Sequence, residues 1–124
     1  MMRALLLVGF GGGAGSIFRY LTSVLVTRYF QGVFPLAVFT VNVSGCFIMG
    51  LLLGLSERLP FVGTDMKLLF VTGFCGGYTT FSTFSAENVD LIQSGHYPTA
   101  FLYMAASVLA GPAAVWLGFA LAKL

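Results

Sequence analysis

The segment that constrains this protein most is Gly73-Phe-Cys-Gly-Gly-Tyr-Thr-Thr-Phe-Ser-Thr-Phe-Ser-Ala-Glu87. It combines adjacent glycines, five serine and threonine side chains and two phenylalanines three positions apart, inside sequence that otherwise resembles a membrane-spanning helix. Irregular, polar backbone is tolerated at membrane depth only where it is buried in protein or lines a water-filled path. The segment therefore predicts a pathway for an ion or a small solute.

The composition of the whole chain predicts a membrane protein. Of its 124 residues, 58% are hydrophobic and only 8% are charged, whereas soluble domains carry about 25% charged residues. Ionised side chains are absent from residues 4–18, 29–56, 68–86 and 91–122. A helix needs roughly 20 apolar residues to cross a bilayer. The sequence thus predicts an all-α membrane protein, a single domain over residues 1–124 with four spans at about 4–26, 35–55, 66–90 and 98–121.

The third predicted span should be broken near its middle. Gly76 and Gly77 are adjacent, and glycine readily adopts backbone conformations that interrupt a helix. We expect the break at residues 75–79. Broken helices at the membrane midplane are a recurring way to bind ions, because they release carbonyl and amide groups.

Charge and small residues suggest how the spans are arranged. An even number of spans places both termini on one side, together with Arg3, Arg58, Lys67 and Lys123, while Arg28 lies on the other side and Arg19 flanks it. This favours cytoplasmic termini, but the excess of cations is small. Insertion in both orientations, and hence an antiparallel dimer, is a hypothesis. The N-terminal apolar run is expected to be a retained first span rather than a signal peptide.

Close helix packing is predicted at pairs of small residues four positions apart: Gly11 and Gly15, Gly50 and Gly54, Gly73 and Gly77, Ala106 and Ala110.

Aromatic and hydroxyl side chains follow the predicted break. Phe81 and Phe84 share a helix face, and Thr80, Thr83 and Glu87 form a stripe beside them. The positive edge of an aromatic ring attracts an anion, and hydroxyl groups replace the water around it. The alternative is that the phenylalanines pack against lipid and the hydroxyls bond to their own helix.

Other polar residues within spans leave two interpretations open. Asn42 is a lone amide in the second span, which either joins helices or donates to a passing ion. Tyr103 and Ser107 place two donors on one face of the fourth span, although Tyr103 also suits a membrane interface. Arg19 either extends to the interface or draws anions to a pore mouth. An arginine in this place argues against a cation carrier.

Several functional classes are disfavoured. Gly9-Phe-Gly-Gly-Gly-Ala14 fits a dinucleotide-binding fingerprint, but that motif needs a strand–helix–strand unit and an acidic residue about 20 positions on. The first acidic residue here is Glu57, so close helix packing explains the glycines better. Cys46 and Cys75 fall within predicted spans, which disfavours a disulfide framework. No basic face for nucleic acid and no nucleophile–base pair is present, so we expect neither nucleic-acid binding nor enzyme activity.

The chain resembles the Fluc family of fluoride channels, also called CrcB proteins, over nearly its whole length. The segments that carry the resemblance are Gly11-Gly12, Gly15 and Arg19-Tyr20; Val41-Asn42, Gly45, Phe47 and Gly50; Gly73 to Gly77 with Thr79 to Phe84; and Tyr103 with Ser107. The resemblance implies a dual-topology antiparallel homodimer in the bacterial inner membrane, with two pores that export cytoplasmic fluoride passively and reject chloride.

The resemblance also implies roles for particular residues. The ring edges of Phe81 and Phe84 would coordinate fluoride, with Asn42 as the pore amide. Thr80, Thr83 and Ser107 would lie on or near a hydroxyl track, with Tyr103 beside the pore and Glu87 near its outer end. The backbone carbonyls of Gly76 and Thr79 would hold a structural sodium ion at the dimer interface.

Two other functions stay open at this point. A small multidrug-resistance-type exporter is also a four-span, dual-topology dimer, but it needs a membrane-embedded carboxylate to exchange protons with a cationic substrate. The first span here contains Arg19 and no acid, which counts against this alternative. A non-transporting scaffold subunit would not explain the polar stripes.

Overall fold

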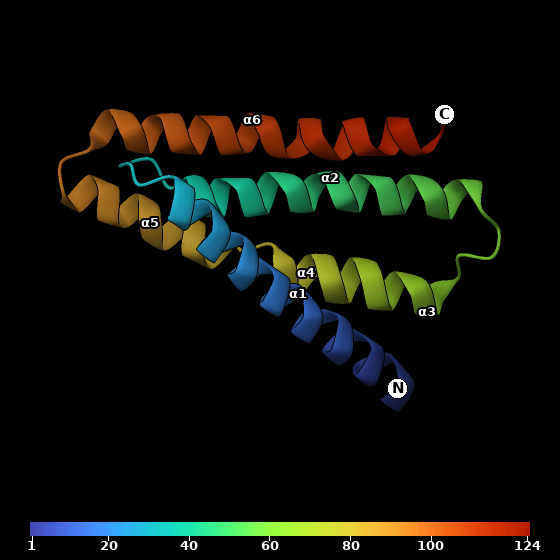
Figure 1. Ribbon diagram of the computed structural model, residues 1–124. Coiled ribbons are helices and arrows are strands. Elements are labelled where there is room, and N and C mark those ends of the chain that lie inside the picture. Colours follow the sequence, from blue (N-terminus) through green and yellow to red (C-terminus); the bar gives the residue numbers. More distant parts are fainter.

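The computed structural model describes residues 1–124, which are almost entirely helical (Figure 1). The elements, in chain order, are α1 (Met2–Tyr29), α2 (Leu36–Arg58), α3 (Thr64–Lys67), η1 (Leu68–Cys75), α4 (Gly76–Tyr78), α5 (Phe81–Gln93) and α6 (Tyr97–Ala122). The element η1 is a π-helical stretch. π-Helical turns are rare and frequently occur at functional sites.

Three helices, α1, α2 and α6, are long and apolar enough to cross a membrane. They contain the predicted spans 4–26, 35–55 and 98–121, apart from Pro35 immediately before α2. The predicted span 66–90 is instead assembled from α3, η1, α4 and α5, which run alongside the long helices (Figure 1). Both termini lie at the same end of the bundle, as an even number of crossings requires (Figure 1).

The break in the third span lies at Thr79 and Thr80, not at the glycine pair. Gly76 is helical, with φ −63° and ψ −37°, and Gly77 continues α4. Thr79 and Thr80 are extended, with ψ of 157° and 120°. The prediction that the two glycines interrupt the helix was therefore wrong, and the predicted range 75–79 reached the break only at its last residue.

Two glycines of this segment, Gly73 and Gly77, pack closely against α1. A Cβ atom on Gly77 would lie 2.9 Å from the Cα of Gly12, and one on Gly11 would lie 3.0 Å from the Phe74 amide nitrogen. Neither side has room for a side chain. The predicted small-residue pairs Gly11–Gly15 and Gly73–Gly77 thus lie on the two faces of one contact, between α1 and the η1–α4 segment.

Helices α2 and α6 pack against each other by the same means. A Cβ atom on Gly50 would lie 2.8 Å from the carbonyl carbon of Val115, and one on Gly118 would lie 2.9 Å from the amide nitrogen of Leu51. Small residues let the backbones of membrane helices approach closely. Together these contacts place α2 between α6 on one side and the broken helix on the other (Figure 1).

The outside of the bundle is apolar. Only 17 of 124 residues are buried, and the exposed side chains include large apolar groups on α1 and α6, among them Phe10, Ile17, Leu109 and Trp116. Water-soluble monomers rarely expose such extensive apolar surface. The chain is a multi-pass membrane protein, whose outer surface suits lipid or another protein.

Candidate ion site at the helix break

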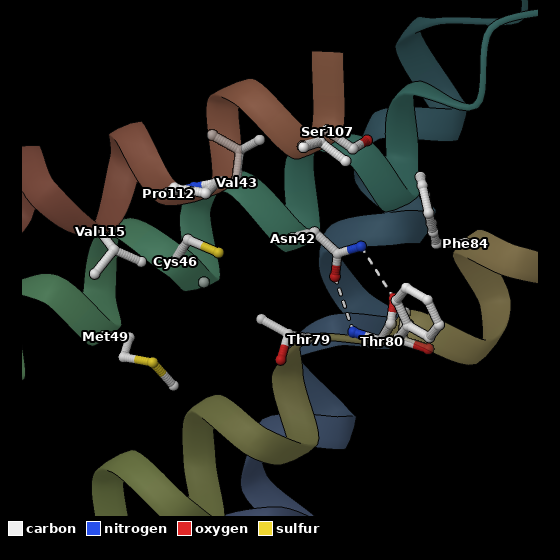
Figure 2. A pocket seen from close by; sticks show the side chains of 14 residues that line it. Asn42, Val43, Cys46, Met49, Thr79, Thr80, Phe84, Ser107, Pro112 and Val115 are labelled. Atoms are coloured by element: carbon white, nitrogen blue, oxygen red, sulfur yellow. Dashed lines mark hydrogen bonds between the residues drawn. The ribbon is translucent and has the colours of Figure 1, made fainter. Parts of the chain in front are cut away.

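Asn42 of α2 holds the break between α4 and α5 with two hydrogen bonds (Figure 2). Its Nδ2 donates to the Thr80 carbonyl oxygen at 3.0 Å, and the Thr80 amide donates to its Oδ1 at 2.8 Å. Buried backbone groups need such partners, and Thr80 is buried. The side chain of Asn42 therefore joins two helices, while one Nδ2 proton stays available to another acceptor.

At the break, two backbone amides bond to side chains instead of to the carbonyls one helical turn earlier. In an uninterrupted α-helix, the Thr80 amide would donate to the Gly76 carbonyl, and the Thr83 amide would donate to the Thr79 carbonyl. The Thr80 amide instead bonds to Asn42, and the Thr83 amide bonds to Thr80 Oγ1 at 3.2 Å. The Gly76 and Thr79 carbonyl oxygens are thus released from the helical ladder.

The released carbonyls have the chemistry of a cation site. Carbonyl oxygens of unwound membrane helices coordinate sodium ions in other proteins. Gly76 is exposed, and no atom outside its own helical turn lies within 4 Å of where its Cβ would be. The donor set and the open surface at Gly76 therefore fit the sodium ion that the sequence resemblance implies.

A hollow of about 430 Å³ opens beside the break, between α2 and α6 (Figure 2). Its walls are mostly apolar, with amide and hydroxyl groups at a few places. Six of the residues that line it are predicted site residues: Asn42, Thr79, Thr80, Phe81, Phe84 and Ser107. The tertiary structure thus brings together residues from three separate spans.

The two phenylalanines of the third span lie next to each other. Their ring centroids are 5.8 Å apart, with 40° between the ring planes. Phe84 is half-buried and packs edge-on against the ring of Tyr103, at 4.9 Å and 61°. Phe81 is 79% exposed. One phenylalanine is therefore held by its own chain, whereas the other lacks a cover on its outer side.

Tyr103 and Glu87 form a second polar group beyond Phe84. The Tyr103 hydroxyl donates to Glu87 Oε1 at 2.8 Å, and Tyr103 is fully buried. Neither residue lines the hollow. The single proton of the Tyr103 hydroxyl is committed to the carboxylate, so Tyr103 can offer a donor to an anion only if that hydroxyl turns away from Glu87.

The remaining predicted residues differ in their surroundings. Ser107 Oγ is buried without a hydrogen-bond partner and lines the hollow. Thr83 is exposed and accepts a hydrogen bond from Thr80 Oγ1 at 3.1 Å, so these two hydroxyls bond to each other rather than back along their helix. Arg19 is half-buried on α1 and does not line the hollow.

The other lining residues, among them Cys46, Met49 and Pro112, were not predicted as site residues from the sequence. Cys46, Met49 and Pro112 contribute to the apolar wall of the hollow (Figure 2). Pro112 lies inside α6, where it has no amide proton to donate to the preceding turn. A proline within a predicted span signals a backbone acceptor without its usual partner, and this signal could have identified the position from the sequence.

Comparisons with known proteins identify relatives across the full length of the chain. A family model described as "CrcB-like protein, Camphor Resistance (CrcB)" matches residues 6–119. A "Fluoride-specific ion channel FluC" of Azobacteroides pseudotrichonymphae is 47% identical, over 99% of this chain and 98% of the relative. Proteins of the same name from Flavobacterium psychrophilum and Phocaeicola vulgatus are 44% and 43% identical, over 98% and 94% of this chain and 98% and 96% of the relatives. On this similarity, the chain belongs to the CrcB-like family.

Proposed function

We propose that this protein is a fluoride-selective ion channel, which moves fluoride passively down its gradient and is not an enzyme. The relatives of nearly equal length are named as fluoride-specific channels. The observation in the structure that supports the proposal best is the hollow at the helix break, where amide, hydroxyl and phenylalanine groups from three spans converge.

The chemistry of this hollow suits a small anion. Fluoride is small and strongly hydrated, so a pore must offer close donors in place of water. Ser107 Oγ and the second Nδ2 proton of Asn42 are donors without a protein acceptor. The ring edges of Phe81 and Phe84 add positive potential without a full charge. A narrow path with these groups favours fluoride over the larger chloride.

The proposed path includes both polar groups of the site. Fluoride passes the residues Asn42, Thr80, Phe81, Thr83, Phe84 and Ser107, and continues toward Tyr103 and Glu87. Arg19 contributes to the vestibule by attracting anions. These residues lie on α1, α2, the break, α5 and α6. In this proposal, residues 1–124 form a single domain, and its helices together supply one side of the path.

A second copy of the chain completes the site. Phe81 is largely exposed, Gly76 is open, and the hollow is not closed by its own chain. We infer an antiparallel homodimer, in which the same face of both copies meets across a two-fold axis. Such a dimer contains two equivalent pores and inserts into the bacterial inner membrane, where it exports fluoride from the cytoplasm.

A sodium ion at the dimer interface would satisfy the released carbonyls. The Gly76 and Thr79 oxygens would hold it, and its charge would offset carbonyl dipoles that otherwise face an apolar surface. The ion is structural in this proposal and takes no part in moving fluoride.

The first test is ion efflux from proteoliposomes that contain the purified protein. Electrodes selective for fluoride and for chloride follow both ions at once, with protein-free liposomes as the control. We expect rapid fluoride loss without chloride loss, driven by the gradient alone. If folded protein releases no fluoride, the channel proposal fails, and proton-coupled transport of organic cations becomes the next measurement.

A further inference from the structure

The Tyr78 hydroxyl connects three helices directly before the break. Tyr78 is the last residue of α4 and is only 6% exposed. Its oxygen lies 3.2 Å from Thr22 Oγ1 on α1 and 3.0 Å from Ser44 Oγ on α2. A phenol group buried in a membrane protein needs such partners, because an unsatisfied polar group costs free energy.

The direction of these hydrogen bonds follows from the number of protons. Ser44 has a single hydroxyl proton, which it donates to the Thr40 carbonyl oxygen at 2.6 Å, with Val41 as a weaker second acceptor at 3.2 Å. Ser44 Oγ must therefore accept from Tyr78, and the Tyr78 oxygen is left to accept from Thr22. The result is a one-way chain from Thr22 to Tyr78 to Ser44 to the Thr40 carbonyl.

The Tyr78 ring is confined as well as its hydroxyl. It stacks on the Phe74 ring, with centroids 5.8 Å apart and 9° between the planes. On α2, Gly45 leaves space for it, since a Cβ atom there would lie 3.0 Å from Tyr78 Cδ2 and would also clash with the Thr79 side chain. The residue before the break thus has little freedom to move or rotate.

We propose that Tyr78 is a positioning residue, whose hydrogen-bond chain holds the end of α4 so that Thr79 and Thr80 present their backbone groups to Asn42 and to the ion site. The chain and the Asn42 pair act on opposite sides of Thr79. Together they hold the extended backbone between two helices, α1 and α2, that are themselves continuous. This inference deepens the proposed function and rests on it for the ion site, but the positioning of the backbone stands on the contacts alone.

The primary test is amide hydrogen exchange of the purified protein in detergent. Tyr78→Phe removes the hydroxyl and keeps the ring, and Tyr29→Phe makes the same change at an exposed tyrosine of α1. We expect exchange of the 79–83 amides to become about tenfold faster or more in Tyr78→Phe, since a lost buried hydrogen bond has an effect of this size. Exchange in the middle of α6 should not change, and Tyr29→Phe should match the wild type.

Conservative variants distinguish positioning from general loss of stability. Thr22→Ser keeps the hydroxyl and Thr22→Val keeps the shape, so the first should retain wild-type exchange at residues 79–83 and wild-type fluoride efflux. The second removes only the Thr22–Tyr78 bond and should reproduce part of the effect of Tyr78→Phe, and adding Thr22→Val to Tyr78→Phe should change little, because Tyr78→Phe already removes that bond.

The outcome separates this inference from the channel proposal. Wild-type exchange at 79–83 in both Tyr78→Phe and Thr22→Val would overturn the positioning role, whatever the efflux. If exchange becomes faster but fluoride efflux is unchanged, Tyr78 has no positioning role in the ion site. A wild-type protein that moves no fluoride would refute the proposed function, while the exchange data would still decide whether Tyr78 holds the break.

Discussion

At the scale of single residues, this site depends on the choice of hydrogen-bond partners. Asn42 offers a donor and an acceptor side by side, as a peptide group does, and Thr80 uses both. Ser107 lies in the same hollow with a hydroxyl that has no partner. Asn42 therefore pairs with the backbone at the break, whereas the Ser107 hydroxyl has no protein partner.

Changing Asn42 to Asp should damage the break with little change in size. The carboxylate still accepts from the Thr80 amide but no longer donates to the Thr80 carbonyl, and the unsatisfied group costs about 1–3 kcal/mol. We expect a lower thermal midpoint and strongly reduced fluoride efflux. Gln31→Glu, the same exchange at an exposed loop residue, is the control. If Asn42→Asp has normal stability and normal efflux, the two hydrogen bonds between Asn42 and Thr80 are not needed for function.

The phenylalanines can be tested with shape-preserving aliphatic residues. Phe81→Ile and Phe84→Ile should each abolish fluoride efflux and leave the dimer assembled, because isoleucine fills space but has no positive ring edge. Phe84→Ile should also lose about 0.5–1.5 kcal/mol of stability, from its edge-on contact with Tyr103. Phe61→Ile, at an exposed position outside the hollow, should behave as the wild type. Wild-type efflux in either pore variant would remove that ring from the mechanism.

At the scale of elements, glycine contacts set how closely α1 approaches the broken helix. Gly11 and Gly77 meet backbone atoms on the facing element, which cannot shift as a flexible side chain does. The break is therefore placed by three neighbours: α1 at the glycine contact, α2 through Asn42, and α6 through the packing of Tyr103 on Phe84.

Two alanine substitutions on α1 should have opposite effects. Gly11→Ala forces a methyl group against the Phe74 backbone, and overpacking of this kind costs roughly 1–3 kcal/mol. Gly13→Ala meets nothing within 4 Å and should stabilise the helix by about 0.5–1 kcal/mol. Thermal denaturation in detergent measures both. Equal stability of the two variants would show that the α1 contact is not as close as described.

At the scale of the whole molecule, the hollow of one chain is open to the outside. Many large apolar side chains are exposed, and Phe81, which lines the hollow, is one of them. At the end of the bundle with both termini, Arg3 pairs with Asp65 and Lys123 pairs with Glu57, each at 2.5 Å. These exposed pairs contribute little stability, and they do not change the number of lysines and arginines at that end, which sets the preferred orientation.

Dual insertion is tested by a reporter at the C-terminus. Reporters that are active only in the cytoplasm, or only outside it, should both give signal with the wild-type chain. Adding two lysines after Leu124 should shift the signal toward cytoplasmic C-termini and reduce fluoride efflux, since an antiparallel dimer needs both orientations. Signal on one side alone for the wild-type chain would refute dual topology.

The positions of the long helices were predictable, and so was the helix face shared by Phe81 and Phe84. Both depend only on residues that are near each other in the sequence. The predicted spans of α1, α2 and α6 follow from the length of each apolar run. The face shared by Phe81 and Phe84 follows from their spacing in a helix, and their rings are neighbours in the structure. The third span was harder to predict, because its residues form π-helical, helical and extended backbone in succession.

The sequence by itself determined an all-helical membrane protein with a polar, phenylalanine-bearing third span, since hydrophobic length and helical periodicity are properties of neighbouring residues. Only the tertiary structure decided where that span breaks and which polar groups are free. Asn42, which is 38 positions before Thr80, accepts from the Thr80 amide in place of the Gly76 carbonyl, and Glu87, which is 16 positions from Tyr103, accepts the hydrogen bond of its hydroxyl. Glycine has a high local tendency to interrupt a helix, but Gly76 and Gly77 are both helical, and Gly77 packs closely against α1. The break therefore formed where a distant side chain could pair with the backbone.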